Sequence, residues 1–353
     1  MTLSNATSAP SGLQSGPPSD PRFIALQTWL TGLDGQPVLP ESLRVASADA
    51  SFRRYFRVDT PDGGSLIVMD APPPQEDVRP FVQVAGLLGN TGVSVPQVLA
   101  QDAERGFLLL TDLGNTTYLH QLNADTAHAL YLDAIDSLVL MQVHSRPGVL
   151  PEYDRAMLLR ELKLFPEWYI GKHLGTTLTD AQSVSLDKVF DALLANNLAQ
   201  AQVTVHRDYH SRNLMVLERG NPGILDFQDA VYGPITYDLV SLLRDAYIAW
   251  DEEMVLDWAI RYWERARRAG LPVAPDIDAF YRDFEFMGVQ RHLKVLGIFA
   301  RLHHRDGKDA YLKNLPLVMH YIRTAAGRYK ELKPLLVLLE ALDGKAPQVG
   351  YTF

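Results

Sequence analysis

The sequence predicts a two-lobed α+β protein, with a small lobe built on an antiparallel sheet followed by a larger, mainly helical lobe. Short aromatic and β-branched runs between turn residues dominate the chain up to about residue 112, and helical patterns dominate the remainder. A polar, strand-like stretch at 202–230 interrupts the helices. We therefore expect a disordered tail at 1–22, a first lobe at 23–112 and a second lobe at 113–353, with a cleft between the lobes.

The first lobe is predicted to contain a helix, two pairs of strands and a second helix. Ser, Pro and Gly dominate the tail, which has too little apolar surface to order itself. The residues Pro-Asp-Gly-Gly at 61–64 separate two strand-like runs and indicate a hairpin. The predicted helices are 23–30 and 80–89, and the predicted strands are 51–58, 65–70, 95–102 and 106–114.

The second lobe is predicted to be helical on both sides of the polar stretch. Apolar residues recur with helical spacing before residue 199 and again from Tyr237 onward. The helical segments before the polar stretch are 119–145, which holds one helix or two, 155–174 and 180–198.

The composition excludes several classes of protein. Of the 353 residues, 47% are hydrophobic and 21% charged, which excludes a fibre, a coiled-coil rod and general disorder. The net charge of −9 makes nucleic acid and anionic membranes poor partners but allows an anionic small ligand. The absence of cysteine excludes disulfides, thiolate metal sites and thiol nucleophiles. No membrane-spanning run or signal peptide is recognisable, so we expect a cytoplasmic chain.

The polar stretch carries the candidate chemistry. Two short strands, 214–217 and 224–227, are joined by a tight turn and are predicted to form an antiparallel hairpin. Asn213 opens the first strand, Asp226 lies near the end of the second, and Asp208 precedes both, so their side chains are expected to converge. The alternative is a hairpin whose polar groups only cap its ends.

These residue types fit phosphoryl transfer, which needs positioning and charge neutralisation more than covalent chemistry. Asn and Asp oxygens are suitable Mg²⁺ ligands, and a carboxylate away from the metal can accept the proton of an attacking hydroxyl. The run H-R-D-x-x-x-x-N followed by D-F matches the catalytic and metal loops of kinases. We interpret His206 as orienting the loop, and Asp238 as capping a helix.

The segments HRDYHSRN at 206–213 and LDFQDAVYGPITYDLVSLL at 225–243 resemble the aminoglycoside phosphotransferase/choline kinase branch of the protein-kinase-like fold. This resemblance covers roughly residues 40–340 and implies ATP and Mg²⁺ as cofactors, Asp208 as the catalytic base, and Asn213 and Asp226 as metal ligands. It also implies that Asp238 is the family's structural aspartate. Further segments are similar to the subgroup of anomeric N-acetylmuramate and N-acetylglucosamine kinases of peptidoglycan recycling; they are SFRRYFRV (51–58), IVMDAPP (67–73), FLLLTDLG (107–114) and VQRHLKVLGIFARL (289–302).

The resemblance also implies a nucleotide site in the first lobe, with FLLLTDLG as the hinge between the lobes and its backbone facing the adenine. Two family features are absent: a glycine-rich G-x-G-x-x-G loop, and a lysine on the third strand, where this chain reads Ile67-Val68-Met69-Asp70. We hypothesise that Arg53 or Arg54 supplies the missing charge; the alternative is that both belong to a solvated strand face. The residues assigned to the nucleotide are Ser51, Phe52, Arg53, Arg54, Met69, Asp112 and Leu113.

For the acceptor, the residues assigned are His210, Asp229 and Arg291. Arg291 lies in the basic run QRHLK, where a cation suits the lactyl carboxylate of N-acetylmuramate. The implied partners are an amino sugar and ATP, with the sugar 1-phosphate passing to a nucleotidyltransferase. Two alternatives remain: a kinase of another small alcohol, such as an aminoglycoside, choline or homoserine, and a nucleotide-binding pseudokinase. The basic run disfavours cationic acceptors, and the retained Asp208, Asn213 and Asp226 disfavour the pseudokinase.

Overall fold

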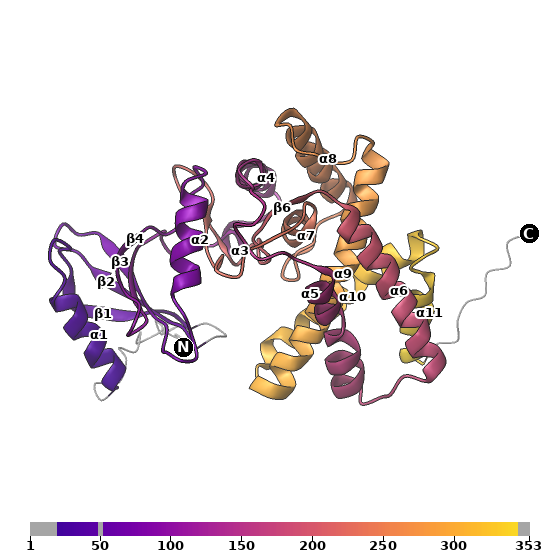
Figure 1. Ribbon diagram of the computed structural model, residues 1–353, viewed down its shortest axis with the longest axis horizontal. Helices are drawn as coiled ribbons and strands as arrows, with labels where there is room; N and C mark the ends of the chain where they lie inside the picture. The colour runs from indigo at the N-terminus through magenta and orange to yellow at the C-terminus, as the bar shows by residue number, and fades with distance from the viewer. Residues whose placement is uncertain (1–19, 49–51, 345–353) are drawn as a thin grey trace, which may run out of the picture. The chain divides into compact units, whose positions relative to one another are not determined.

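The computed structural model describes residues 20–48 and 52–344 (Figure 1). The chain divides into two compact units. Unit 1 contains the chain up to Gly89 together with Val95–Gly114, and unit 2 contains Asn90–Ser94 together with the chain from Asn115 onward. The division after residue 114 lies close to the expected one after residue 112, but the segment 90–94 belongs to unit 2.

Unit 1 contains a five-stranded sheet in the order β1-β2-β3-β5-β4, with all neighbouring strands antiparallel. Gly63, with φ of 86°, makes the predicted turn between β2 and β3. The strand β1 was not predicted, because Pro40 and Glu41 obscure its pattern; it lies at the sheet edge, where proline is tolerated. The strands are β1 (Leu39–Ala48), β2 (Arg54–Asp59), β3 (Ser65–Asp70), β4 (Val98–Asp102) and β5 (Phe107–Thr111).

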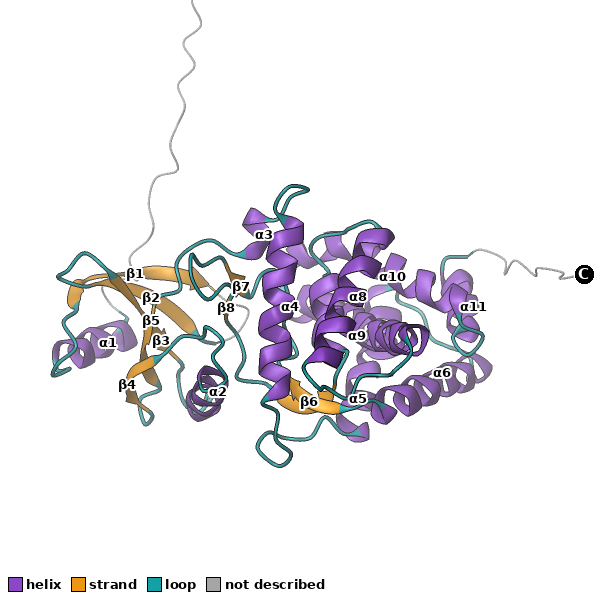
Figure 2. Ribbon diagram, turned by 90° about the horizontal axis from the view of Figure 1, so that it is seen from above, coloured by secondary structure: helices purple, strands orange, loops and turns teal. Residues whose placement is uncertain are grey.

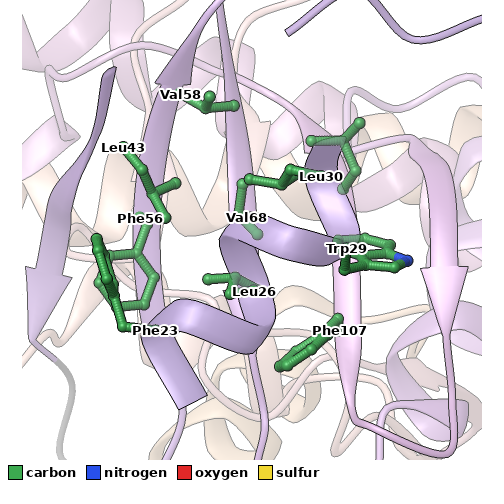
Figure 3. Packing of buried hydrophobic residues seen from close by; sticks show 10 residues of the cluster. Phe23, Leu26, Trp29, Leu30, Leu43, Phe56, Val58, Val68 and Phe107 are labelled. Carbon is green, nitrogen blue, oxygen red and sulfur yellow. The ribbon is translucent and has the colours of Figure 1, made fainter. Parts of the chain in front are cut away.

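The helices of unit 1 are α1 (Pro21–Thr31) and α2 (Arg79–Gly89). The helix α1 starts at Pro21, before the expected start at Phe23, and Asp20 is its N-cap residue. Residues 1–19 of the expected tail lie outside the described residues. Figure 3 shows the core that α1 forms with the sheet. Phe23 packs on Phe56 at 5.5 Å between ring centroids, and Trp29 packs on Phe107 at 5.7 Å. The helix is therefore an integral part of unit 1.

Unit 2 is mainly helical, and α9 lies in the middle of its helices (Figure 2). The helix α9 packs against α6, α7, α10 and η1. A Cβ atom at Gly297 of α9 would lie 2.5 Å from the backbone of Leu164, so glycine allows this close approach. The helices are α3 (Tyr118–Gln121), α4 (Ala127–Val143), α5 (Arg155–Leu162), η1 (Phe165–His173), α6 (Asp180–Ala199), α7 (Tyr237–Leu243), α8 (Glu252–Arg268), α9 (Ile277–Asp306), η2 (Asp309–Asn314), α10 (Leu315–Arg328) and α11 (Lys333–Leu342).

The helical segment predicted at 155–174 is present, but it divides into α5, which ends at Leu162, and the wider helix η1, which begins at Phe165. Pro166 has no backbone N–H to continue the α-helical hydrogen bonds. The expectation of helices over 119–145 and 180–198 is confirmed by α3, α4 and α6. None of the helices in the described part of the chain has the length and apolar character needed to span a membrane.

Two small antiparallel pairs carry the polar stretch. The strand β6 (Gln202–Val205) pairs with β9 (Val231–Pro234), which was not predicted. The predicted hairpin is confirmed by β7 (Leu214–Met215) and β8 (Gly223–Ile224), although both strands are shorter than expected. The pairing of Leu214 with Ile224 brings the residues on either side of the hairpin together.

Candidate active site

The loop after β6 and the segment after β8 bring together the three polar residues that the sequence singled out. The backbone oxygen of Asp208 accepts hydrogen bonds from the backbone N–H of His210 and from Nδ2 of Asn213, both at 3.0 Å. Asn213 Nδ2 also donates to Oδ2 of Asp226 at 3.4 Å. Asp226 adopts a left-handed backbone conformation with φ of 63°. The predicted convergence of Asp208, Asn213 and Asp226 is therefore present within unit 2.

His206 connects the loop to the segment that carries Asp226. Its Nε2 donates to the backbone oxygen of Leu225 at 2.9 Å, and its Nδ1 accepts from the backbone N–H of Asp208 at 3.2 Å. These partners define the neutral tautomer with the proton on Nε2. Burial lowers the pKa of His206 to about 4, so the ring is uncharged at neutral pH. The side chain of His206 therefore links Asp208 to the segment that carries Asp226.

Asp238 holds the start of the same loop. Its carboxylate accepts the backbone N–H of His206 at 2.6 Å and that of Arg207 at 2.9 Å. Arg207 has φ of 78°, a strained conformation that these bonds support. The expectation that Asp238 caps a helix is wrong, because the N-cap residue of α7 is Thr236. Burial raises the pKa of Asp238 to about 7, although the two N–H donors oppose this shift.

Asp208 is half-buried, and neither of its carboxylate oxygens accepts a hydrogen bond from a described residue. Burial alone would raise the pKa of this carboxyl, but electrostatic interactions with Lys294, His210 and Arg291 outweigh burial and hold the pKa below its usual value. The carboxylate is therefore ionised at neutral pH and has both oxygens available. A general base for a hydroxyl proton needs these two properties.

Lys294 belongs to a charged network beside the loop. Its Nζ lies 3.1 Å from Glu161 Oε1 and donates to the Tyr237 hydroxyl at 3.0 Å. Glu161 also accepts hydrogen bonds from Arg207 and from the Tyr153 hydroxyl. Burial would raise the pKa of Glu161, but Lys294 and Arg207 lower it, so the acid is ionised between two cations. Sequence reasoning missed Glu161, because a single acidic residue in a helix carries no motif.

Two of the residues assigned to the acceptor lie near Asp208 with unpaired polar atoms. The Arg291 side chain is almost buried, its Nη1 has no hydrogen-bond partner, and it forms no ion pair within the described residues. His210 Nδ1 is also buried without a partner, and its ring meets that of Tyr247 edge-on with 5.4 Å between centroids. Asp229 is exposed, and its backbone oxygen accepts a hydrogen bond from Arg207 Nη1 at 3.4 Å.

The donor set around Asp226 fits a hard cation. Asn213 uses its amide nitrogen toward Asp208 and Asp226, which leaves Oδ1 as its ligand atom. Gln228 Nε2 donates to Oδ1 of Asp226 at 2.8 Å, a contact that the D-F-Q sequence did not reveal. The described residues contain no cluster of three or more His, Asp or Glu suited to a metal. Mg²⁺ fits such a sparse set, because it keeps several waters and binds substrate phosphates.

In unit 1 the two arginines proposed to replace the strand lysine both contact carboxylates. Arg54 Nε donates to Asp70 Oδ2 at 3.0 Å, and Arg22 Nε donates to Asp70 Oδ1 at 2.9 Å. Arg54 also pairs with Asp20. Arg53 Nη2 lies 3.0 Å from Glu76 Oε2. A bound phosphate would therefore compete with these carboxylates for either arginine.

The remaining residues assigned to the nucleotide have varied surroundings. Met69 is buried in β3, and Phe52 is exposed. The Asp112 carboxylate accepts hydrogen bonds from Arg57 and from Ser65 Oγ, which tie the end of β5 to β2 and β3. Leu113 is half-buried beside it, and Ser51 lies outside the described residues.

The fold and the site together define an enzyme that transfers phosphoryl groups. The family model described as "Phosphotransferase enzyme family" matches residues 42–271, and the chain belongs to this family.

Two curated relatives match almost the whole chain. A protein of Neisseria meningitidis serogroup B named N-acetylmuramate/N-acetylglucosamine kinase is 55% identical over 340 residues, covering 94% of this chain and 99% of the relative. A protein of the same name from Pseudomonas aeruginosa is 50% identical over 331 residues, covering 92% of this chain and 97% of the relative. The family resemblance noted in the sequence is thereby confirmed.

Solved structures share the fold at low identity. The amicoumacin kinase hAmiN in complex with AMP-PNP, Ca²⁺ and Ami aligns with a TM-score of 0.59 and 15% identity, covering 86% of this chain and 93% of that structure. An ethanolamine kinase from Plasmodium vivax aligns with a TM-score of 0.58 and 11% identity, covering 91% of this chain and 88% of that structure. The predicted class, a small antiparallel-sheet unit and a mainly helical unit of protein-kinase-like fold, is confirmed.

Proposed function

We propose that this chain is an ATP- and Mg²⁺-dependent sugar kinase that phosphorylates the anomeric hydroxyl of N-acetylmuramate and N-acetylglucosamine. The observation that carries the reaction type is Asp208, whose ionised carboxylate accepts no hydrogen bond from a described residue. The backbone oxygen of Asp208 accepts a hydrogen bond from Asn213 Nδ2, which also donates to Asp226. The names of the relatives at 55% and 50% identity support the choice of acceptor.

In the proposed reaction, an oxygen of Asp208 accepts the hydroxyl proton while the sugar oxygen attacks the γ-phosphorus. The bond between the γ-phosphorus and the bridging oxygen breaks, ADP leaves, and the proton later passes from Asp208 to water. Asn213 and Asp226 would hold Mg²⁺, which supplies charge neutralisation for the phosphate oxygens when bound. An anomeric hydroxyl is more acidic than other sugar hydroxyls, so a carboxylate is a sufficient base.

The nucleotide residues named from the sequence remain part of the proposal. A phosphate would compete with the carboxylates that these arginines already contact, which are Glu76 for Arg53 and Asp70 and Asp20 for Arg54. We propose a cytoplasmic site of action, because ATP is the phosphoryl donor. A sugar 1-phosphate is an activated acceptor for a nucleotidyl group, so a sugar-1-phosphate nucleotidyltransferase is the class of enzyme proposed to consume the product.

The test is phosphorus NMR of the purified chain with ATP, Mg²⁺ and each sugar. We expect a new anomeric phosphate signal with the unaltered chain, and a rate lower by about 10²–10⁴-fold for Asp208→Asn, because general-base catalysis is lost. Asp187→Asn, at an exposed acid on α6, is the matched control and should keep the full rate.

Three outcomes separate the parts of the proposal. If neither sugar reacts but another small alcohol does, the acceptor assignment is wrong and the kinase assignment stands. If Asp208→Asn keeps the full rate with an unchanged melting temperature, the base has been misassigned. ATP binding without transfer to any alcohol would favour the pseudokinase.

A further inference from the structure

The central helix α9 presents two cations near the catalytic loop, and only one of them is neutralised. Lys294 pairs with Glu161 at 3.1 Å. Arg291, one helical turn earlier, is 4% exposed and has no ion pair with any described residue. By contrast Arg244, which is 1% exposed, lies 3.1 Å from Glu285 and 2.9 Å from Glu252.

A guanidinium removed from water without a carboxylate partner is unfavourable, because its lost hydration is not replaced. Arg291 lies on α9 one helical turn before Lys294, whose partner Glu161 also pairs with Arg207 of the catalytic loop. In agreement with this placement, the charge of Arg291 lowers the pKa of the Asp208 carboxyl. His210 Nδ1 is a second buried polar atom without a partner in the same neighbourhood. These two unpaired groups indicate a polar subsite next to the base, with an anion as its natural occupant.

We infer that Arg291 is the anion subsite for the acceptor and receives the lactyl carboxylate of N-acetylmuramate. This inference rests on the proposed function. A guanidinium can bind a carboxylate through two parallel N–H···O bonds, which gives orientation as well as affinity. N-acetylglucosamine has no carboxylate, so Arg291 is a residue that distinguishes the two acceptors.

The nucleotide phosphates are the other possible source of negative charge. The phosphates are expected beside Asn213 and Asp226, the proposed metal ligands. The charge of Arg291 instead affects the pKa values of Asp208 and His210 in the catalytic loop and of Asp238, which holds that loop. The acceptor hydroxyl must meet Asp208 for its proton to be taken. A cation near Asp208 is therefore better placed for a group on the acceptor than for one on the nucleotide.

The experiment compares kcat/KM for three acceptors with Arg291→Gln and Arg291→Lys. The acceptors are N-acetylmuramate, its lactyl amide, and N-acetylglucosamine. The ratio of kcat/KM values for N-acetylmuramate and N-acetylglucosamine should fall about 10- to 100-fold in Arg291→Gln and less in Arg291→Lys. The unaltered chain should prefer the acid to its amide, and Arg291→Gln should lose this preference.

The ratio isolates acceptor recognition, because a change in the pKa of Asp208 or in folding affects both sugars alike. Arg301→Gln, on the same helix, is the matched control and should leave the ratio unchanged. An equal loss for all acceptors, or a raised KM for ATP with an unchanged ratio, would overturn the inference and assign Arg291 to the loop or to a phosphate. If the unaltered chain phosphorylates neither sugar, the proposed function itself fails, and this inference fails with it.

Discussion

Asp70 in unit 1 and Asp208 in unit 2 are both carboxylates with cationic neighbours, yet their surroundings differ in kind. Asp70 is fully buried, and both of its oxygens accept hydrogen bonds from guanidinium groups, those of Arg22 and Arg54. Asp208 is half-buried, and the cations near it lower its pKa without occupying its oxygens. Asp70 therefore links α1 to the sheet, whereas the carboxylate of Asp208 remains available to a substrate.

The same difference separates two arginines. Arg54 was hypothesised to bind phosphate, but in the structure it is paired with Asp70 and Asp20. Arg291 has no such partner within the described part of the chain. The residue type is the same in both places, and the difference lies in the partners: Arg54 contacts two carboxylates, whereas Arg291 contacts none among the described residues.

The largest stability effect is expected from Asp70→Asn. Removing one charge leaves two guanidinium groups opposed by a neutral amide, which should cost about 2 kcal/mol of unfolding free energy. Both arginines are partly exposed, so the loss should be smaller than for a fully buried pair. Urea unfolding measures the loss, and hydrogen exchange should locate it in α1, β2 and β3.

Asp59→Asn is the matched control, because Asp59 pairs with Arg44 at the surface and should contribute less than about 1 kcal/mol. Wild-type stability in Asp70→Asn together with a lost rate would contradict the comparison. It would mean that Asp70 acts in catalysis and is not a structural carboxylate.

A second prediction concerns the cations around Asp208. Lys294 is the largest of the charges that lower the pKa of this carboxyl, so Lys294→Met should raise that pKa. The base must be ionised, and the acid limb of the kcat/KM profile should therefore move to higher pH, with the greatest loss of rate in acid. Lys188→Met, at an exposed lysine of α6, should leave the profile unchanged. A lower plateau with an unmoved acid limb would show that Lys294 acts only through packing.

Much of this architecture was predictable, because its signals are local. The strands of 65–70 and 106–114, the helix α6 and the convergence of Asp208, Asn213 and Asp226 all follow from patterns within a few dozen residues. The strand β1 was missed because its pairing with β2, and not its own composition, makes it a strand.

Partners distant in the sequence were not predictable. Arg22 meets Asp70 across 48 residues, and Arg207 meets Glu161 across 46. Each of these contacts depends on how the elements pack, which no spacing within the chain expresses. Sequence reasoning found Arg291 through its basic run, but only the structure shows that it forms no ion pair with a described residue.

Asp226 is intermediate between Asp70 and Asp208, because its oxygens accept hydrogen bonds but from neutral amides. Changing one of these amides gives the smallest effect that we expect. Gln228 Nε2 donates to one of its oxygens at 2.8 Å, and Asn213 Nδ2 lies 3.4 Å from the other. A partner that orients a metal ligand typically contributes about 10-fold in metal affinity or somewhat more. Gln228→Ala should therefore raise the Mg²⁺ concentration for half-maximal rate about 10-fold.

Saturating Mg²⁺ should restore most of the rate in this variant, since the ligand itself is intact. Gln101→Ala, at an exposed position on β4, should leave the Mg²⁺ dependence unaltered. If saturating Mg²⁺ leaves Gln228→Ala slow, then Gln228 acts on the transferred group itself and not through Asp226. The variant Asp226→Asn distinguishes these two roles of Gln228. It weakens the proposed metal ligand directly, so it should shift the Mg²⁺ dependence more than Gln228→Ala does.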